Sequence, residues 1–300
     1  MNTPTPVSGP GIVVGVDGSP GALRAVEWAA VGAAGRRLPL RLVFAVDPSG
    51  EAGTDVAGRR ISRAAETALA EASRRALVVD RSIQVMTEVV HASPAAALIR
   101  GAGGDAAMIC LGSNGVRPAH PGHRVSTATE VVLTADCPVA VVRGPSPRYG
   151  WAVAKIDSEP SLADVLHLAV TEAALRGLPL RLLTTWTVRT ADGEAMELDR
   201  RLRRNLDRWR QRHPHLDVVV VACPDLDEFL SHNAHRIALF VGPRRQLHAV
   251  GTVIDPSVEV ATRLLDCPVI IDTGVGGSGM TDTSFENAGS EGLHVPSGMS

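Results

Sequence analysis

The segment from Gly112 to Thr127 contains glycines and hydroxyl side chains, which together have the chemistry of an anion site. Gly112 and Gly115 follow an apolar run, and residues without a Cβ let the backbone approach a phosphate closely. Ser126 and Thr127 begin a predicted helix, whose free N–H groups and dipole favour an anion. A simpler interpretation is that one of these hydroxyls only caps the helix, since Thr127 with Glu130 matches a capping box.

The elements that must position these residues are those of a parallel α/β sheet. Short apolar runs alternate with helical patterns, and such sheets bind ligands at the carboxyl ends of their strands. Two further strands of the first half end at this edge, one before Asp17 and the other at Ala45 and Val46. Asp47, which precedes a proline, is interpreted as a turn residue.

Periodicity predicts five strands and four helices in each half of the chain. In the first half, strands are expected at 12–16, 40–46, 83–89, 106–111 and 138–143, and helices begin near 20, 57, 94 and 126. In the second half, strands are expected at 151–156, 180–185, 218–222, 237–241 and 269–272, and helices at 160–176, 194–212, 225–234 and 257–265. Ser19 and Ser93, each followed by proline, are predicted helix caps, and Gly35 is expected to end the first helix.

The chain contains an internal repeat. Asp-Cys-Pro-Val occurs at 136–139 and again at 266–269, an offset of 130 residues. Leu-Pro-Leu-Arg-Leu occurs at 38–42 and at 178–182, an offset of 140 residues. Two copies of one unit, the second shorter in its middle, explain both offsets. A residue that the fold requires should survive in both copies, whereas a residue needed only for chemistry can be lost from one.

Composition excludes several classes of function. The 300 residues carry a net charge of −2 and only 3% aromatic side chains, which argues against a nucleic-acid surface or an anionic membrane surface. Seven arginines between Arg200 and Arg212 are interleaved with acidic residues, so partial self-neutralisation is expected. Four cysteines are too few for a disulfide framework, and no apolar run can span a membrane. Without a signal peptide at residues 1–10, a soluble cytoplasmic protein is expected.

Catalytic and metal-binding constellations are weak in this sequence. His120 and His123 can ligate a metal, but Pro121 and Gly122 between them favour a mobile loop, and no acidic or cysteine partner is adjacent. The sequence has no Walker lysine and no Ser/His/Asp trio that the topology would assemble. We therefore predict no metal site and no catalytic residue, and slow nucleotide hydrolysis is the weakest functional interpretation.

Three features together resemble the universal stress protein family. They are Asp17-Gly-Ser after a buried strand, the pattern Gly112-x2-Gly115-x9-Val125-Ser126, and Cys137-Pro-Val before the last strand of the half. The resemblance implies two tandem Rossmann-like domains, each an open five-stranded parallel sheet of order 3-2-1-4-5 with helices on both faces. The expected domains are residues 11–145 and 151–273, between a disordered start at 1–10 and a Gly/Ser-rich tail at 274–300.

Many members of this family bind ATP, and the resemblance carries a site over by position. The matching residues are Asp17 and Ala45 at adenine, Gly112 and Gly115 beside the ribose and phosphates, and Ser126 and Thr127 at the phosphate end. Val125 departs from the pattern, because it replaces the third glycine with a branched side chain where backbone should approach phosphate. The first half is therefore expected to bind ATP or another adenine nucleotide, with weakened binding of a triphosphate.

The second half keeps Gly242 at the position of the first glycine and loses the rest of the pattern. Arg245, Asp255 and Pro256 replace the second glycine, the valine and the serine. A carboxylate repels phosphate and a proline has no N–H to donate, so this half is predicted to keep the fold without the nucleotide. Arg244 and Arg245 are interpreted as a solvated pair on a loop, with anion binding as the alternative.

Two functions remain open at this point. One is a stress-response regulatory module that binds an adenine nucleotide in its first half only. The other is a family member that binds no nucleotide and acts through protein contacts alone. In either case the resemblance implies that the last strands, Val139–Val142 and Val269–Ile271, pair the two halves within one chain, which can in turn form a homodimer.

Overall fold

The computed structural model describes residues 10–47, 55–112, 126–144, 149–156, 159–184, 193–247 and 251–273. The elements of the first half are β1 (Ile12–Gly15), α1 (Pro20–Arg36), β2 (Leu40–Val46), α2 (Asp55–Val79), β3 (Val85–His91), α3 (Pro94–Ala102), β4 (Met108–Gly112), α4 (Thr127–Thr134) and β5 (Val139–Val142). The second half has β6 (Trp151–Ile156), α5 (Glu159–Arg176), β7 (Leu180–Thr184), α6 (Gly193–Arg212), β8 (Val218–Ala222), α7 (Leu226–Asn233), a 3₁₀ turn (Ala234–Arg236), β9 (Ile237–Leu247), β10 (Gly251–Ile254), α8 (Pro256–Leu264) and β11 (Val269–Asp272).

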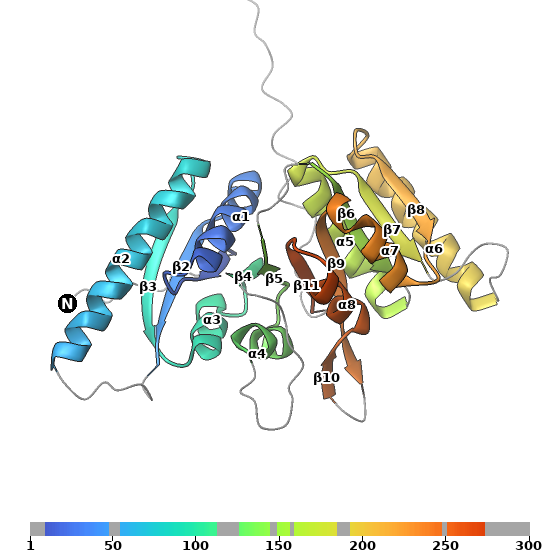
Figure 1. Ribbon diagram of the computed structural model, residues 1–300. Helices are drawn as coiled ribbons and strands as arrows, with labels where there is room; N and C mark the ends of the chain where they lie inside the picture. The colour runs from blue at the N-terminus through green and yellow to red at the C-terminus, as the bar shows by residue number, and fades with distance from the viewer. Residues whose placement is uncertain are drawn as a thin grey trace, which may run out of the picture.

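The strands of both halves join into one continuous sheet (Figure 1). Its order is β3-β2-β1-β4-β5-β11-β9-β6-β7-β8, with β10 paired to β9 beside this path. Counted within each half, this is the order 3-2-1-4-5 twice, and all pairings of these ten strands inside a half are parallel. The predicted α/β fold, with two tandem Rossmann-like units, is confirmed.

The two halves meet at an antiparallel seam between β5 and β11. Val141 lies opposite Val269, Ala140 opposite Ile270, and Val139 opposite Ile271. Each of these residues is completely buried, as expected for continuous apolar residues in strands that are covered on both faces. The pairing of last strands that the sequence implied is therefore present within a single chain.

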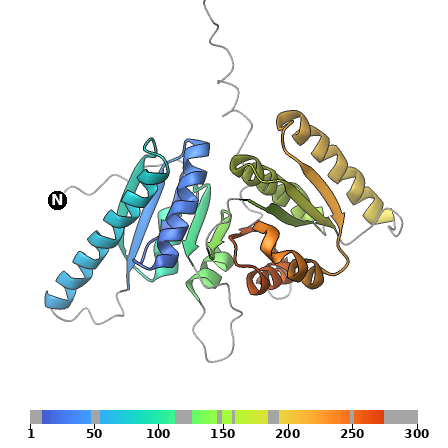
Figure 2. The ribbon, with the colours of Figure 1, turned by 45° about the horizontal axis from the view of Figure 1, so that its top comes forward.

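Helices cover both faces of the sheet, and each face has one hydrophobic core (Figure 2). Buried residues of α1, α2, α5 and α6 pack with one side of the strands in both halves. Those of α3, α4, α7 and α8 pack with the other side. None of the described helices has an apolar stretch long enough to cross a membrane.

The helix caps are partly as predicted. Ser19 and Ser93 accept hydrogen bonds from the N–H groups of Ala22 and Ala96, so both predicted N-caps are confirmed. The prediction that Gly35 ends α1 is wrong, because the helix continues to Arg36. Gly35 serves packing instead, because a Cβ there would lie 2.9 Å from side-chain carbons of Leu175.

The second half contains one strand that the sequence did not predict. β9 continues past the expected end at Val241 to Leu247, and then β10 pairs with it in an antiparallel hairpin. The equivalent strand of the first half, β4, ends at Gly112. The hairpin therefore occupies the part of the second half where the first half has its predicted phosphate loop, and β10 contacts α4 of the first half.

Candidate functional site

Three predicted site residues lie at the carboxyl edge of the first half's sheet. β1 is central and pairs with β2 on one side and β4 on the other. Asp17 follows β1, Ala45 lies near the end of β2, and Gly112 is the last residue of β4. Gly115 and Val125 lie outside the described residues, as do His120 and His123.

Asp17 shapes the turn that starts α1. Its side chain is exposed, and Oδ1 accepts a hydrogen bond from the Ser19 N–H at 2.8 Å. Gly18 between them has φ 80°, a conformation that favours glycine. The Ser19 hydroxyl in turn accepts from the Ala22 N–H at 3.2 Å. Asp17 therefore presents a carboxylate at the sheet edge while also holding the strand-to-helix turn.

Ala45 and Phe44 point to opposite faces of the sheet. Ala45 is half-buried, lies opposite Val90 of β3, and packs with the α3 and α4 core. Phe44 packs with the core under α1 and α2. Because strand side chains alternate, the adenine-side residue predicted from the sequence lies on the same face as the start of α4.

The packing of β4 against α1 requires a glycine at position 112. A Cβ at this position would lie 2.1 Å from the Gly21 carbonyl carbon and 2.5 Å from the Ala22 nitrogen. The end of β4 therefore lies directly against the first turn of α1, where only glycine fits without a backbone shift. This contact explains why a glycine is present, whether or not a ligand binds beside it.

Ser126 is the N-cap of α4. Its hydroxyl oxygen accepts from the Thr129 N–H at 3.1 Å and lies 2.8 Å from the Thr129 hydroxyl. The alternative capping box led by Thr127 is wrong, because Thr127 is already the first helical residue. The N–H groups of Thr127 and Ala128 have no acceptor within the helix, so they remain as donors at its tip.

A cleft of about 570 Å³ opens beside the β1 turn, on the face of α1 and α2. It is lined by Asp17, Gly18, Leu23, Phe44, Arg60, Arg63, Ala64, Thr67, Ala68 and Glu71. Among the described residues of the predicted site, Asp17 alone contributes to this lining. Arg60 and Arg63 of α2 are exposed and also line the cleft. No sequence signal distinguishes them from the other charged residues of α2.

Glu71, which also lines the cleft, carries a fixed negative charge. Hydrogen bonds from Arg74 and Arg75 lower the pKa of the Glu71 carboxyl to about 2. Arg75 also contacts Glu27 of α1 at 2.6 Å. Glu71 is therefore ionised at any physiological pH, and its role is an ion pair rather than proton transfer.

The equivalent helix start of the second half is filled by the chain itself. Asp255 is the N-cap of α8, only 1% exposed, and its Oδ1 accepts from the Ser257 N–H at 2.8 Å and the Ser257 hydroxyl at 2.5 Å. A buried carboxylate thus occupies the place that an anion would take. This arrangement supports the predicted loss of the nucleotide from the second half.

Arg244 is not a solvated loop residue, so that interpretation from the sequence is wrong; it lies on β9. It is half-buried, and its guanidinium donates to the carbonyls of Val132, Ala135 and Thr273 at 2.8–3.2 Å. Val132 and Ala135 lie at the carboxyl end of α4, where carbonyls lack intrahelical partners. The side chain of Arg245 lies outside the described residues.

Arg143 makes the reciprocal contact. It reaches from the end of β5 to the carbonyls of Thr262 and Leu265 at the carboxyl end of α8. These carbonyls are equivalent to those that Arg244 holds, since each lies 130 residues further along the chain. Each half therefore supplies an arginine that caps the corresponding helix of the other half, although the two arginines come from different positions in the repeat.

The four cysteines are reduced and buried. Burial raises the pKa of the Cys137 thiol to about 11 and that of Cys267 to about 12, and it raises the pKa of Cys110 further. Such thiols are protonated and unreactive at neutral pH. Within the described ranges, no cluster of three or more metal-ligating side chains occurs.

The basic helix α6 is partly neutralised by its own acidic residues. Glu197 lies within 3.4 Å of Arg200, Arg201 and Arg204. Further pairs join Arg203 to Asp199 and Arg210 to Asp207. The self-neutralisation predicted from the sequence is therefore present.

Comparison with known proteins identifies the class. The model of the universal stress protein family matches residues 11–143. A universal stress protein of Mycobacterium tuberculosis is 37% identical over 222 residues, which cover 71% of this chain and 77% of the relative. A second from the same organism is 33% identical over 271 residues, covering 87% and 98%. The chain belongs to the universal stress protein family.

The fold agrees with a solved structure of the same family. A universal stress protein from Archaeoglobus fulgidus superposes with a TM-score of 0.67, covering 88% of this chain and 98% of that one, at 14% sequence identity. At this identity the likeness shows the fold alone, so function must be argued from the residues of this chain.

Proposed function

We propose that the protein is a regulatory module of the stress response rather than an enzyme, and that its first half binds ATP or another adenine nucleotide. Asp17 and Ala45 would contact adenine, Gly112 and Gly115 the ribose and phosphates, and Ser126 and Thr127 the phosphate end, beside Val125. We further propose that the two halves are domains, residues 11–145 and 151–273, working in the cytoplasm.

The start of α4 is the observation that carries this proposal. Its tip has the Ser126 hydroxyl and two N–H donors without intrahelical acceptors, on the face of the sheet to which Ala45 packs. The equivalent tip of α8 holds the buried Asp255 carboxylate instead. The contrast supports an exchangeable anion in the first half and a built-in one in the second.

A second candidate is a family member that binds no nucleotide and acts through protein contacts. One observation favours it: Gly112 is explained by its contact with Gly21, so this glycine is no longer evidence for a ligand. Val125 favours it as well, because a branched side chain replaces the glycine of the family pattern.

Mass spectrometry of small molecules released from the purified, undialysed protein separates these candidates. A thermal-shift titration of ATP, ADP and AMP accompanies it, on wild type and on Asp17→Ala and Gly115→Arg. We expect a saturable shift in wild type that both variants lose. An empty protein with no shift up to millimolar nucleotide would favour the second candidate.

Asp80→Ala is the matched control for Asp17→Ala. Asp80 makes the same kind of turn, because its Oδ1 accepts from the Ser82 N–H at 2.7 Å. It lies before β3, at the opposite edge of the sheet. We expect Asp80→Ala to lower the melting temperature without changing the nucleotide-dependent shift. A loss of the shift in both variants would assign the effect to the turn and not to the site.

A further inference from the structure

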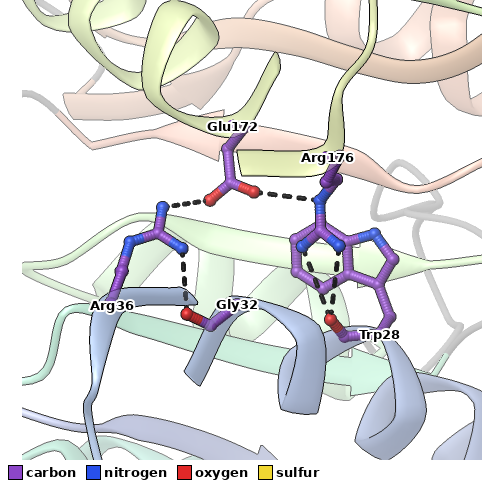
Figure 3. Close-up of polar contacts among 5 residues, drawn as sticks. All are labelled: Trp28, Gly32, Arg36, Glu172 and Arg176. Atoms are coloured by element: carbon purple, nitrogen blue, oxygen red, sulfur yellow. Dashed lines mark hydrogen bonds and ion pairs between the residues drawn. The ribbon is translucent and has the colours of Figure 1, made fainter. Parts of the chain in front are cut away.

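The first helices of the two halves, α1 and α5, meet across the seam near equivalent residues. With the offset of 140, Gly32 corresponds to Glu172 and Arg36 corresponds to Arg176. The repeat is therefore unequal in this contact: the second half has a carboxylate where the first half has no side chain. Figure 3 shows both arginines reaching toward this single carboxylate.

The carboxylate is fully buried and bridges both guanidinium groups. Glu172 is 0% exposed; its Oε1 lies 2.5 Å from Arg36 Nη2, and its Oε2 lies 3.1 Å from Arg176 Nε. The side chains of Arg36 and Arg176 are themselves only 15% and 11% exposed. A carboxylate in such a place is tolerated only because each of its oxygens has a charged partner.

Other N–H groups of the two guanidiniums donate to backbone carbonyls of α1, and one guanidinium also lies over an aromatic ring of α1. Arg36 Nη1 donates to the Gly32 carbonyl at 3.4 Å. Arg176 donates to the Trp28 carbonyl at 3.4 and 3.5 Å, and its Cζ lies 3.9 Å from the centre of the Trp28 ring. Carbonyl acceptors and a π face suit the one positive charge that Glu172 does not balance.

This charge inventory differs among the pairings that a repeated unit allows. The observed pair of unlike halves buries two guanidiniums and one carboxylate. Two first halves, paired in the same way, would bring together two copies of Arg36 with glycine at both acidic positions. Two second halves would be neutral, with two copies of Glu172 and Arg176. The free energy of burying a net charge rises more steeply than the charge itself. Two unlike pairs, each with a net charge of +1, are therefore favoured over one neutral pair and one pair with a net charge of +2.

We propose that the Arg36–Glu172–Arg176 cluster is a specificity determinant: it makes the surface of the first half accept the second half of its own chain and reject another first half. The β5 edge alone does not discriminate in this way, because apolar strands pair readily with copies of themselves. The buried cluster supplies the discrimination because an unpaired guanidinium cannot keep its hydration inside the interface.

The unequal repeat allows the carboxylate to be moved. A Cβ at Gly32 would lie 3.3 Å from Arg36 Nη1, 3.7 Å from Arg176 Nη2 and 3.2 Å from the flexible end of Ile12. The pair Gly32→Glu and Glu172→Gly therefore transposes the carboxylate to the first half. It also exchanges one helical glycine for another, so helix propensity is nearly unchanged.

Thermal unfolding of the full chain is the first test. We expect Glu172→Gly to lower the melting temperature by roughly 5–10 °C, and the transposed double variant to recover most of this loss. Glu197→Gln is the control, since Glu197 is 44% exposed and also lies among arginines; we expect a shift of about 1 °C or less. No recovery in the transposed variant would overturn the proposal.

Cross-linking tests the specificity itself. Ala140 lies opposite Ile270 in the observed seam, so in a pair of two first halves position 140 would lie opposite its own copy. The variant Ala140→Cys, refolded from urea and oxidised with diamide, reports such pairs as interchain disulfides on a non-reducing gel. We expect several-fold more cross-linked dimer when Glu172→Gln is added than when Glu197→Gln is added. Equal yields, including none in either, would overturn the proposal.

Discussion

The starts of α4 and α8 are equivalent in the two halves, but one is capped by a neutral hydroxyl and the other by a buried carboxylate. At α4 the cap is the Ser126 hydroxyl, and two backbone N–H groups remain as donors. At α8 the cap is the buried Asp255 carboxylate, and Pro256 removes one of the donors. The comparison teaches that the same helix start can hold a carboxylate of the chain in one half and leave backbone donors in the other, so the fold does not require a built-in anion there.

The retained glycines are the strongest test of what the fold needs. We expect Gly112→Ala to lower the free energy of unfolding by about 3 kcal/mol, because its Cβ would meet the backbone of Gly21. Gly242→Ala should cost only about 1 kcal/mol, because the nearest atom, at 2.8 Å, is the movable Val258 Cγ2. Urea unfolding of both variants measures the difference. Equal losses would mean that the two halves use this glycine in the same way.

Substitution of the two reciprocal arginines, Arg244 and Arg143, should have the next largest effect on the free energy of unfolding. Arg244→Ala removes hydrogen bonds to three carbonyls and Arg143→Ala to two, so we expect losses of about 3 and about 2 kcal/mol in the free energy of unfolding. Arg244→Lys should recover only part of the loss, because an ammonium lacks the planar fork. Urea unfolding is again the measurement. Full recovery by lysine would show that charge at the end of α4 matters more than geometry.

The helix caps give a smaller effect. We expect Ser126→Ala and Asp255→Ala to lower the free energy of unfolding by about 1 and about 2 kcal/mol, since Asp255 holds two hydrogen bonds from Ser257. Asp255→Asn, which keeps an acceptor and removes the charge, isolates the electrostatic part. If Ser126→Ala were the more costly change, the idea that α8 depends on its own carboxylate would fail. Calorimetric unfolding at one pH compares all three.

The equivalent thiols Cys137 and Cys267 sharpen the comparison at alkaline pH. Their folded pKa values, about 11 and about 12, lie above the ordinary value of 9.0, so the folded state holds the proton more tightly. Below pH 9 they add no pH dependence. Above it the unfolded thiols ionise first, and each costs about 1.4 kcal/mol of stability per pH unit until its folded pKa is reached. Urea unfolding of each alanine variant from pH 8.5 to 11 should show a correspondingly shallower decline than wild type.

Local patterns were sufficient to predict most of the fold. The Ser-Pro pairs at Ser19 and Ser93 mark helix starts, and continuous valine and isoleucine runs mark buried strands such as β5 and β11. These signals depend on neighbours in sequence, so they can be read without knowing the fold. The hairpin β9–β10 was missed because Pro243 and Arg244 do not look like strand residues.

The long-range polar contacts could not be predicted from local patterns. Arg244 looks like a surface residue until α4 is known to end beside it. Glu172 occurs in the apolar stripe of α5 between Ala169 and Ala173, and that position was a usable signal that it is buried. Its partner Arg36, however, is 136 residues away. Of the site itself, the sequence anticipated that Asp17 and Gly112 share one sheet edge, but not the cleft that Asp17 lines with α2.

The central place of the β5–β11 seam has a consequence for protein synthesis. A ribosome finishes Val139–Val142 long before it reaches Val269–Asp272, the last strand of the described chain. Until β11 emerges, a folded first half carries an open apolar strand edge, which is a template for other nascent chains on the same messenger RNA. Before residue 172 is translated, those neighbours display the same edge and the same Arg36 without Glu172. On the specificity proposed above, repulsion between like first halves protects the chain during this early interval, and translation of β11 ends the exposure of the edge.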